Sequence, residues 1–288
     1  MFDAPVGALT YKKMKKRIPY SKITYTLIGI MILFDSHLHL NHTDFAGQEA
    51  QTWNAAVAQG VTQGVVVGFD LESSAKAIRL AETLPGLCAS VGVSPHDILQ
   101  APVNYLEQIQ TLALHPRVVA IGETGLEYHY PVGPKEMQRQ YLTQQAQLAD
   151  RLHKPLIIHL READEDFLQF LQNTAPASAV LHCFTASEAV LRASLKRDYF
   201  ISFSGMITFK NADILRQLAS QVPDEHLLIE TDAPYLAPVP YRGKTCEPKM
   251  MVKTAQKMAE LRGTDLITLG ALTRANAQRA FQLVVSEG

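Results

Sequence analysis

Residues 34–39, Phe34-Asp35-Ser36-His37-Leu38-His39, directly follow the apolar run of residues 28–33. Such a run predicts a buried β-strand, and residues i and i+2 of a strand point to the same face. His37 and His39 would therefore direct two imidazoles to one point where the strand ends. Imidazole is a good ligand for zinc, manganese or iron and a poor one for calcium. The stretch predicts a first strand that ends at a metal site, although the pair alone would equally suit two surface histidines.

The same unit, a short apolar segment followed by a helical one, repeats along the chain about eight times. The further expected strands are residues 64–68, 87–93, 118–122, 155–158, 179–181, 199–203 and 226–230. The expected helices are residues 50–59, 72–84, 103–114, 135–152, 163–172, 187–196, 211–221, 249–262 and 265–283. Continuous apolar strands that alternate with helices are typical of parallel sheets covered on both faces. We therefore expect a (β/α)8 TIM barrel, formed as a single domain by residues 31–288.

Composition narrows the class of function. The chain has 288 residues, 47% of them hydrophobic, which is enough for one large core. Its net charge of −1 gives no overall basic surface for nucleic acid, so an anionic substrate needs local cations or a metal. The cysteines are far apart and include no CxxC pair: Cys88, Cys183 and Cys246. This spacing disfavours a disulfide scaffold or a zinc ribbon and fits a reducing cytoplasm.

The first thirty residues differ from the rest. A basic cluster at residues 12–17 precedes an apolar stretch at residues 23–33, an order found in signal peptides. The apolar stretch is interrupted by Thr26, lacks a small-residue cleavage site and is too short to span a bilayer. We expect residues 1–30 to be a tail, disordered or the result of a start assigned too far upstream, with Met31 as the start of the fold. The alternative is an arm that lies on a membrane surface.

Six potential metal ligands stand at the C-terminal ends of expected strands: His37, His39, Glu123, His159, His182 and Asp232. That end of a TIM barrel carries the active site. A single histidine there is often solvated, and a single aspartate often caps the next helix. Six such residues from several strands are instead what a catalytic metal site requires.

The number of ligands suggests two metal ions. One site could use His37, His39 and Asp232, and the other His159 and His182. Glu123 has two carboxylate oxygens and could bridge the two ions, which would then activate a water between them. Asp232 could also accept the proton of that water. The same ligands serve magnesium, manganese and zinc, so we expect two divalent ions without assigning the element.

Several longer motifs resemble those of a known family. They are residues 34–39, Gly122-Glu123-Thr124-Gly125-Leu126, residues 155–159, residues 180–184, Leu228-Ile229-Glu230-Thr231-Asp232-Ala233-Pro234, and Arg242-Gly243-Lys244 with Glu247-Pro248. The chain resembles TatD-type metal-dependent hydrolases of the amidohydrolase superfamily from about Met31 to the last helix. The resemblance implies a TIM barrel, a two-metal site of the six residues, and deoxyribonuclease activity, often 3′ to 5′ on single strands. It also implies that Glu123 is the bridging ligand, where other relatives use a carbamylated lysine.

Two positions depart from the pattern of that family. Its usual Gly-x-His-Pro-His segment is Gly92-Val93-Ser94-Pro95-His96 here, so that Ser94 replaces a histidine facing the active site. Its usual Gly-Leu-Asp is Gly125-Leu126-Glu127, which is one methylene longer. Both departures concern substrate placement more than metal binding.

Candidate substrate-binding residues are Arg161, His96, Ser94 and Arg242. Arg161 lies two residues after His159 and shares its strand face, and an arginine fork suits a phosphate. Ser94 can hydrogen-bond a phosphate but carries no charge. Lys244 is equally well explained as a solvated surface residue. Phe184, Tyr128 or Tyr235 could stack on bases, although aromatic residues near a barrel rim are more often packing residues.

Three functions remain open at this point. The first is a two-metal phosphodiesterase that acts on single-stranded DNA or DNA ends, without a membrane or an obligatory protein partner. The second is a hydrolase of a small amide or ester that uses the same activated water, an alternative that Ser94 and the nearly neutral net charge keep open. The third is a non-catalytic metal-binding accessory protein, against which the complete set of six ligands argues.

Overall fold

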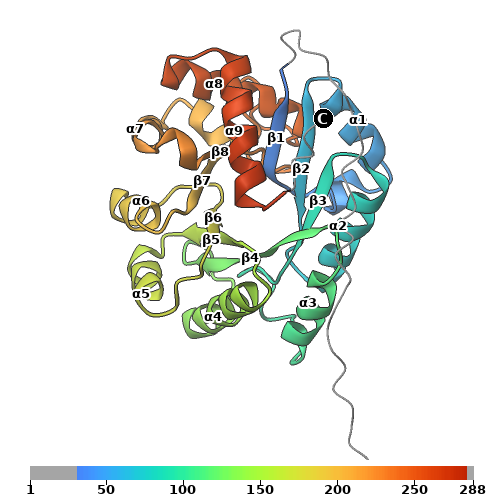
Figure 1. Ribbon diagram of the computed structural model, residues 1–288, viewed down its shortest axis with the longest axis vertical. Coiled ribbons are helices and arrows are strands. Elements are labelled where there is room, and N and C mark those ends of the chain that lie inside the picture. Colours follow the sequence, from blue (N-terminus) through green and yellow to red (C-terminus); the bar gives the residue numbers. More distant parts are fainter. Residues whose placement is uncertain (1–30, 284–288) are drawn as a thin grey trace, which may run out of the picture.

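The computed structural model describes residues 31–283 and contains one eight-stranded sheet in the order β1-β2-β3-β4-β5-β6-β7-β8. All paired strands are parallel, and the helices lie around them (Figure 1). The strands are β1 (Leu33–Leu38), β2 (Val61–Val67), β3 (Leu87–Val91), β4 (Val118–Glu127), β5 (Leu156–Arg161), β6 (Ala179–Leu181), β7 (Phe200–Phe203) and β8 (Leu227–Ile229). The α-helices are α1 (Glu49–Val57), α2 (Leu71–Thr83), α3 (Tyr105–Ala113), α4 (Lys135–Arg151), α5 (Asp164–Thr174), α6 (Glu188–Leu195), α7 (Asp213–Gln221), α8 (Met251–Arg262) and α9 (Leu266–Ala280). Short 3-10 helices are η1 (Thr43–Phe45), η2 (Gly205–Thr208), η3 (Asp224–His226) and η4 (Pro248–Met250). The TIM barrel predicted from the sequence is confirmed.

Most strand boundaries differ from the prediction by a few residues. Strand β1 begins at Leu33 and continues past the apolar run of residues 28–33 to Leu38, so it ends at the two histidines, as the sequence suggested. Strands β4 and β5 likewise continue past Glu123 and His159. The reason is that the backbone there still pairs with its neighbour, as Gly125 does with His159. Several candidate ligands are thus held within strands and not in loops.

The first and last strands meet at a buried carboxylate. Asp35 Oδ2 accepts a hydrogen bond of 2.6 Å from the Thr231 hydroxyl, and Asp35 Oδ1 accepts one of 2.9 Å from the Thr231 backbone N–H. The Asp232 N–H donates to the carbonyl of His37 at 2.9 Å. These bonds join β1 to the segment after β8, so they close the ring and place His37 beside Asp232.

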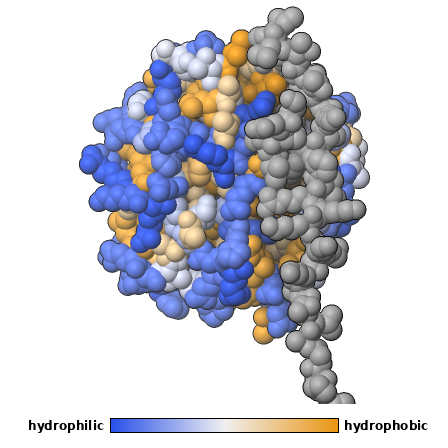
Figure 2. Space-filling view, in the orientation of Figure 1, coloured by the Kyte–Doolittle hydropathy of each residue, from blue (hydrophilic) through white to orange (hydrophobic). Residues whose placement is uncertain are grey.

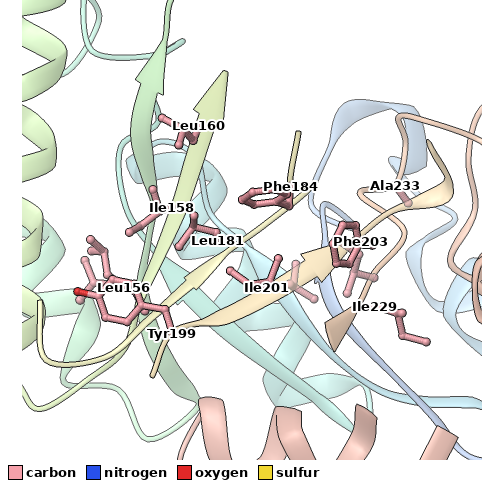
Figure 3. Packing of buried hydrophobic residues seen from close by; sticks show 14 of the residues in the cluster. Leu156, Ile158, Leu160, Leu181, Phe184, Tyr199, Ile201, Phe203, Ile229 and Ala233 are labelled. Carbon is pink, nitrogen blue, oxygen red and sulfur yellow. The ribbon is translucent and has the colours of Figure 1, made fainter. Parts of the chain in front are cut away.

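Strand β5 illustrates how the core is divided. Leu156, Ile158 and Leu160 belong to the larger apolar cluster, which Figure 3 shows on β5 to β8. Ile157 points to the other face and belongs to a smaller cluster inside the barrel. This alternation is the period of two expected of a strand whose two faces are both buried. The sheet is therefore fixed on both faces, which gives the strand ends a rigid base.

The C-terminal end of α9 closes the inside of the barrel. Phe281 directly follows this helix and is 2% exposed, and its ring stacks on that of Phe34 with centroids 6.1 Å apart. Ala277 and Ala280 join the same inner cluster. Phe34 stands at the start of β1 and His37 near its end, so this apolar plug lies opposite the candidate site.

The outer surface shown in Figure 2 is largely hydrophilic, with separate hydrophobic areas between the polar ones. Within residues 31–283, no helix has both the length and the apolar character needed to cross a bilayer. The expected tail at residues 1–30 lies outside the described residues, as do residues 284–288.

Candidate metal centre

The first pair of candidate ligands comes from β1 and the residue after it. His37 Nε2 and His39 Nε2 lie 3.1 Å apart, and both rings are buried. His39 Nδ1 donates to the carbonyl of Val67 on β2 at 3.0 Å, which leaves the lone pair on Nε2. Asp232 Oδ1 lies 3.5 Å from His39 Nε2 and 3.8 Å from His37 Nε2. Three side chains thus have potential ligand atoms within 3.8 Å of one another, and they are the three residues predicted to share one site.

The second pair comes from the next part of the barrel. His159 on β5 and His182 after β6 have their Nδ1 and Nε2 atoms, respectively, 3.3 Å apart. Both atoms lie 3.2 Å from Glu123 Oε1. The imidazole of His182 also stacks on that of His37, with centroids 3.8 Å apart, so the two pairs adjoin.

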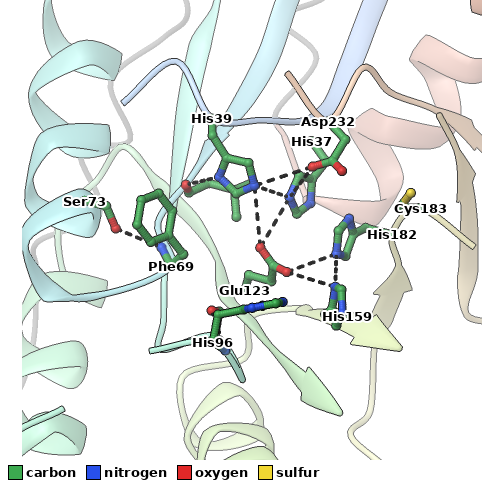
Figure 4. Close-up of polar contacts among 12 residues, drawn as sticks. His37, His39, Phe69, Ser73, His96, Glu123, His159, His182, Cys183 and Asp232 are labelled. Atoms are coloured by element: carbon green, nitrogen blue, oxygen red, sulfur yellow. Dashed lines mark hydrogen bonds and ion pairs between the residues drawn. The ribbon is translucent and has the colours of Figure 1, made fainter. Parts of the chain in front are cut away.

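Glu123 lies between the two pairs. Figure 4 shows one of its oxygens directed to His37 and His39 and the other to His159 and His182. Its Oε2 is 3.6 Å from the Nε2 atom of both His37 and His39. Each oxygen of one carboxylate therefore faces its own pair of histidines. This is the arrangement that a ligand bridging two ions requires.

The electrostatics of Glu123 favour its ionised form. Burial would raise the pKa of this carboxyl, but the neighbouring imidazoles of His182, His159 and His37 outweigh burial and hold the pKa well below its usual range. Conversely, burial disfavours the charged form of His182, yet Glu123 and Glu230 raise its pKa well above the usual value. The cluster therefore has a strong affinity for positive charge.

Close packing of β4 places Glu123 in this position. Gly125 has φ +152°, and a Cβ atom there would lie 1.9 Å from the carbonyl oxygen of His159, so only glycine allows β4 and β5 to approach. On the helix side, Gln145 Nε2 donates to the Thr124 hydroxyl at 2.8 Å and to the Val93 carbonyl at 2.9 Å. The two residues that follow Glu123, Thr124 and Gly125, are thereby fixed.

Two further carboxylates orient the histidines from behind. Glu127 Oε2 accepts a hydrogen bond of 3.1 Å from His159 Nε2, which leaves Nδ1 of that ring for the centre. Glu230 Oε1 lies 3.5 Å from His182 Nδ1 and accepts the Cys183 N–H at 2.8 Å. Carboxylates behind metal-ligating histidines fix the ring orientation and raise the basicity of the ligand.

The donor set fits divalent metal ions. Two groups of three, His37-His39-Glu123 and Glu123-His159-His182, have ligand atoms within 4.8 Å of one another. Within residues 31–283, no ion pair joins Glu123 or Asp232 to a lysine or an arginine. His37 Nδ1 is buried without a hydrogen-bond partner. Imidazoles and carboxylates that converge without a cationic side chain are chemically suited to Mn²⁺ or Zn²⁺, and the carboxylates also to Mg²⁺.

The predicted substrate residues fall into two groups. His96 and Arg161 lie beside the centre: the His96 ring is 5.8 Å from that of His159, and Arg161 ends β5 two residues after His159. Ser94 is buried, donates to Asp97 Oδ2 at 2.6 Å and accepts the His96 N–H at 3.2 Å. Arg242 is exposed, and its guanidinium lies 3.7 Å from the ring centre of Phe209. The described contacts bring His96 to the centre but do not bring Arg242 there.

Comparison with known proteins agrees with this geometry. A family model described as TatD related DNase matches residues 34–282. The chain belongs to the TatD family.

The TatD relatives cover nearly the whole described barrel. The metal-dependent hydrolase YabD of Bacillus subtilis (strain 168) is 36% identical over 254 residues, which are 88% of this chain and 100% of YabD. The 3′-5′ ssDNA/RNA exonuclease TatD of Escherichia fergusonii is 34% identical, with 86% of this chain and 98% of that protein covered. The crystal structure of the TatD homologue YjjV from Escherichia coli K12 superposes with a TM-score of 0.83 at 28% identity, covering 88% and 100% of the two chains. The resemblance to the TatD family predicted from the motifs is confirmed.

Sequence reasoning missed two residues that lie beside the candidate ligands or the side chains behind them, Glu230 and Tyr130. Glu230 was noted only as part of a motif, yet it stands two residues before Asp232 at the end of a strand, which was a usable signal. Tyr130 follows Glu127 by three residues, and its N–H donates to Glu127 Oε1 at 3.1 Å. No pattern in the sequence marks that contact, because it depends on how the loop after β4 folds.

Proposed function

We propose that this chain is a divalent-metal-dependent hydrolase that removes nucleotides from single-stranded DNA ends in the 3′ to 5′ direction. The observation that carries the proposal is Glu123, whose two oxygens each face a separate pair of histidines at 3.2–3.6 Å. The name of the E. fergusonii relative, a 3′-5′ ssDNA/RNA exonuclease, supports the choice of substrate and polarity. The net charge of −1 supports strand ends over long duplexes, because a broad basic surface is absent from the composition.

We propose that the centre holds two divalent ions, Mg²⁺, Mn²⁺ or Zn²⁺, and that each ion is held by the side chains whose ligand atoms lie close together. His37, His39 and Asp232 would hold one ion, and His159 and His182 the other, with Glu123 shared. Ions in such sites supply Lewis acidity and lower the pKa of water.

The side chains of the chain itself have distinct tasks in this mechanism. Asp232 Oδ1 lies at the edge of the centre, 3.5 Å from His39 Nε2, where it can accept the proton of the attacking water. Burial would raise the pKa of Asp232, but the hydrogen bond with His39 and the nearby imidazoles lower it, so the carboxylate is ionised and ready to accept. Glu127 and Glu230 keep His159 and His182 in their orientation while the substrate binds.

Substrate contacts are assigned by position. His96, whose side chain is 44% exposed, and Arg161 lie beside the centre, and we assign them to the phosphate at which cleavage occurs. Ser94 already binds Asp97 and the His96 backbone, so we assign it to the substrate through the placement of His96. Arg242, outside the centre, is assigned to a phosphate farther along the strand.

A cytoplasmic location completes the proposal. It is favoured by the absence of disulfides among the described residues, which include every cysteine of the chain.

The test is hydrolysis of an end-labelled single-stranded oligonucleotide by metal-stripped protein refilled with Mg²⁺, Mn²⁺ or Zn²⁺. Wild type should give a ladder from the 3′ end and bind about two ions per chain. Glu123→Gln should lose more than about 100-fold in rate, because even residues behind metal ligands contribute about 10–100-fold. Glu72→Gln, an exposed glutamate on α2, is the matched control. Two bound ions without cleavage of any oligonucleotide would contradict the proposal and favour a small-molecule amide or ester hydrolase.

A further inference from the structure

We propose that Tyr235 and Tyr130 are two stacking platforms, one on each side of the metal centre, that bind the nucleobases flanking the cleaved phosphate. The inference rests on the proposed function, because it names the substrate groups that the same site recognises. It gives a binding role to two exposed aromatic side chains that are needed neither to form the metal centre nor to pack the barrel.

Tyr235 stands next to the first half of the centre. Its backbone N–H donates to the carbonyl of Asp232 at 2.8 Å, so the ring is fixed to the segment that carries a candidate ligand. Its ring centroid lies 6.2 Å from that of His39 and 5.7 Å from that of His42, both at steep angles. Half of the residue, 50%, is nevertheless exposed. A large aromatic surface therefore faces solvent directly beside His39.

Tyr130 stands next to the other half. Glu127 accepts its backbone N–H at 3.1 Å and the Nε2–H of His159 at 3.1 Å, so one carboxylate holds both this loop and a candidate ligand. The ring centroid lies 6.3 Å from that of His96. Tyr130 is 49% exposed, and the guanidinium of Arg161 lies 4.9 Å from its ring centre. The ring thus lies against the guanidinium of Arg161 and the ring of His129, whose centroid is 4.6 Å away at 84°, and half of the residue remains exposed.

The two tyrosines are on opposite sides of the barrel mouth. Tyr130 follows β4 and Tyr235 follows β8, and in a ring ordered β1 to β8 these two strands lie half a turn apart. The ligand atoms of Glu123 lie between the histidines of the two halves. A strand whose phosphate lies at Glu123 would therefore extend one neighbouring nucleoside towards each tyrosine.

The chemistry of these platforms fits bases of any sequence. Stacking on an aromatic ring uses the π-face that all four bases share, and it needs no hydrogen-bonding pattern. An arginine against the same ring adds a cation for the adjoining phosphate. Within residues 31–283, neither tyrosine hydroxyl has a hydrogen-bond partner, so the exposed rings contribute no polar anchor to the fold. The two tyrosines would thus bind the flat face of any nucleobase and would not distinguish one base from another.

The experiment compares Tyr235→Ala and Tyr130→Ala on single-stranded oligonucleotides that are intact or that carry a tetrahydrofuran abasic residue at the last or the penultimate position. Each variant should lose about 5- to 150-fold in kcat/KM on the intact strand, the range expected for one stacked base. The loss should vanish on the strand that lacks the base stacked on that tyrosine. Tyr→Phe variants should cleave like wild type, because they keep the ring.

Controls separate this inference from folding and from the proposed function. Tyr235→Leu and Tyr130→Leu keep apolar bulk but have no π-face, so they should lose activity like the alanine variants while their melting temperature and metal content stay at the wild-type values. Ile214→Ala, at a 76% exposed position on α7, should behave as wild type. If wild type degrades no oligonucleotide, the proposed function fails. Two outcomes with an active wild type would refute the stacking platforms. One is that the leucine variants match the wild-type kcat/KM within twofold, and the other is that they lose equal activity on the intact and the abasic strands.

Discussion

Replacing Asp35 tests whether one buried aspartate side chain closes the barrel. In wild type its oxygens accept the Thr231 hydroxyl at 2.6 Å and the Thr231 N–H at 2.9 Å, and the residue is 0% exposed. Asp35→Ala would leave these two donors buried without acceptors. Each such donor costs about 1–3 kcal/mol, so we expect the free energy of unfolding to fall by about 2–6 kcal/mol. For a domain of this size the melting temperature should then fall by roughly 4–24 °C.

The assay is thermal unfolding followed by calorimetry, with Asp35→Asn as the matched variant. Asparagine keeps the shape and an acceptor for the Thr231 N–H, while the Thr231 hydroxyl can turn to accept from the new amide. We therefore expect Asp35→Asn to stay within about 1 kcal/mol of wild type. If the alanine and asparagine variants melted within 2 °C of each other, the role assigned to these two hydrogen bonds would be wrong.

Four further predictions follow from other parts of the structure. Glu127→Gln should weaken metal affinity by about 10–100-fold, because it removes the anionic acceptor behind His159; isothermal titration measures this, and unchanged affinity would contradict it. Phe281→Ala should destabilise the barrel by about 3–5 kcal/mol in urea unfolding, because it empties the apolar plug inside the barrel; a change below 1 kcal/mol would show that the plug is dispensable. The hydrogen bond with Tyr128 lowers the pKa of Asp166; burial opposes this shift and Arg139 reinforces it. Ionised Asp166 therefore contributes its full stability above the unfolded-state pKa near 3.9, and this contribution is lost as the pH falls through the lower folded-state pKa. Between pH 6 and pH 2, the difference in free energy of unfolding between wild type and Asp166→Asn should thus shrink. A difference that stays constant over this range would refute the stabilising role of ionised Asp166. A chain that starts at Met31 should fold and keep the activity of the full chain, which circular dichroism and the oligonucleotide assay decide.

The fold was predictable because each strand is a continuous apolar run and each is followed by a helical segment. The candidate ligands were predictable because parallel strands end at the same side of a barrel, so His159 and His182 had to be neighbours. The strand ends themselves were less accurate. The continuous apolar run stops at Ile158, but backbone pairing with β4 continues to Arg161, and no property of the side chains marks where that pairing ends.

The polar groups behind the ligands could be predicted only in part. Glu127 was visible as a longer side chain than the family pattern has. Its two oxygens, however, accept from a histidine on β5 and from two N–H groups of its own loop, His129 and Tyr130. Burial would raise the pKa of Glu127, but the hydrogen bonds with His159 and with the backbone lower it to about 2. Contacts of this kind depend on the conformation of one loop, which no periodicity in the sequence specifies.

The contact between Asp35 and Thr231 joins residues that are 196 positions apart in the chain. During synthesis from the N-terminus, His37 and His39 leave the ribosome long before Asp232 exists, and until then β1 has no strand on its outer edge. A chain released before β8 is made therefore carries most of the candidate ligands but lacks Asp232 and the closed ring that holds them together. The assembled centre is therefore a late product of translation, and a chain truncated before β8 would lack it.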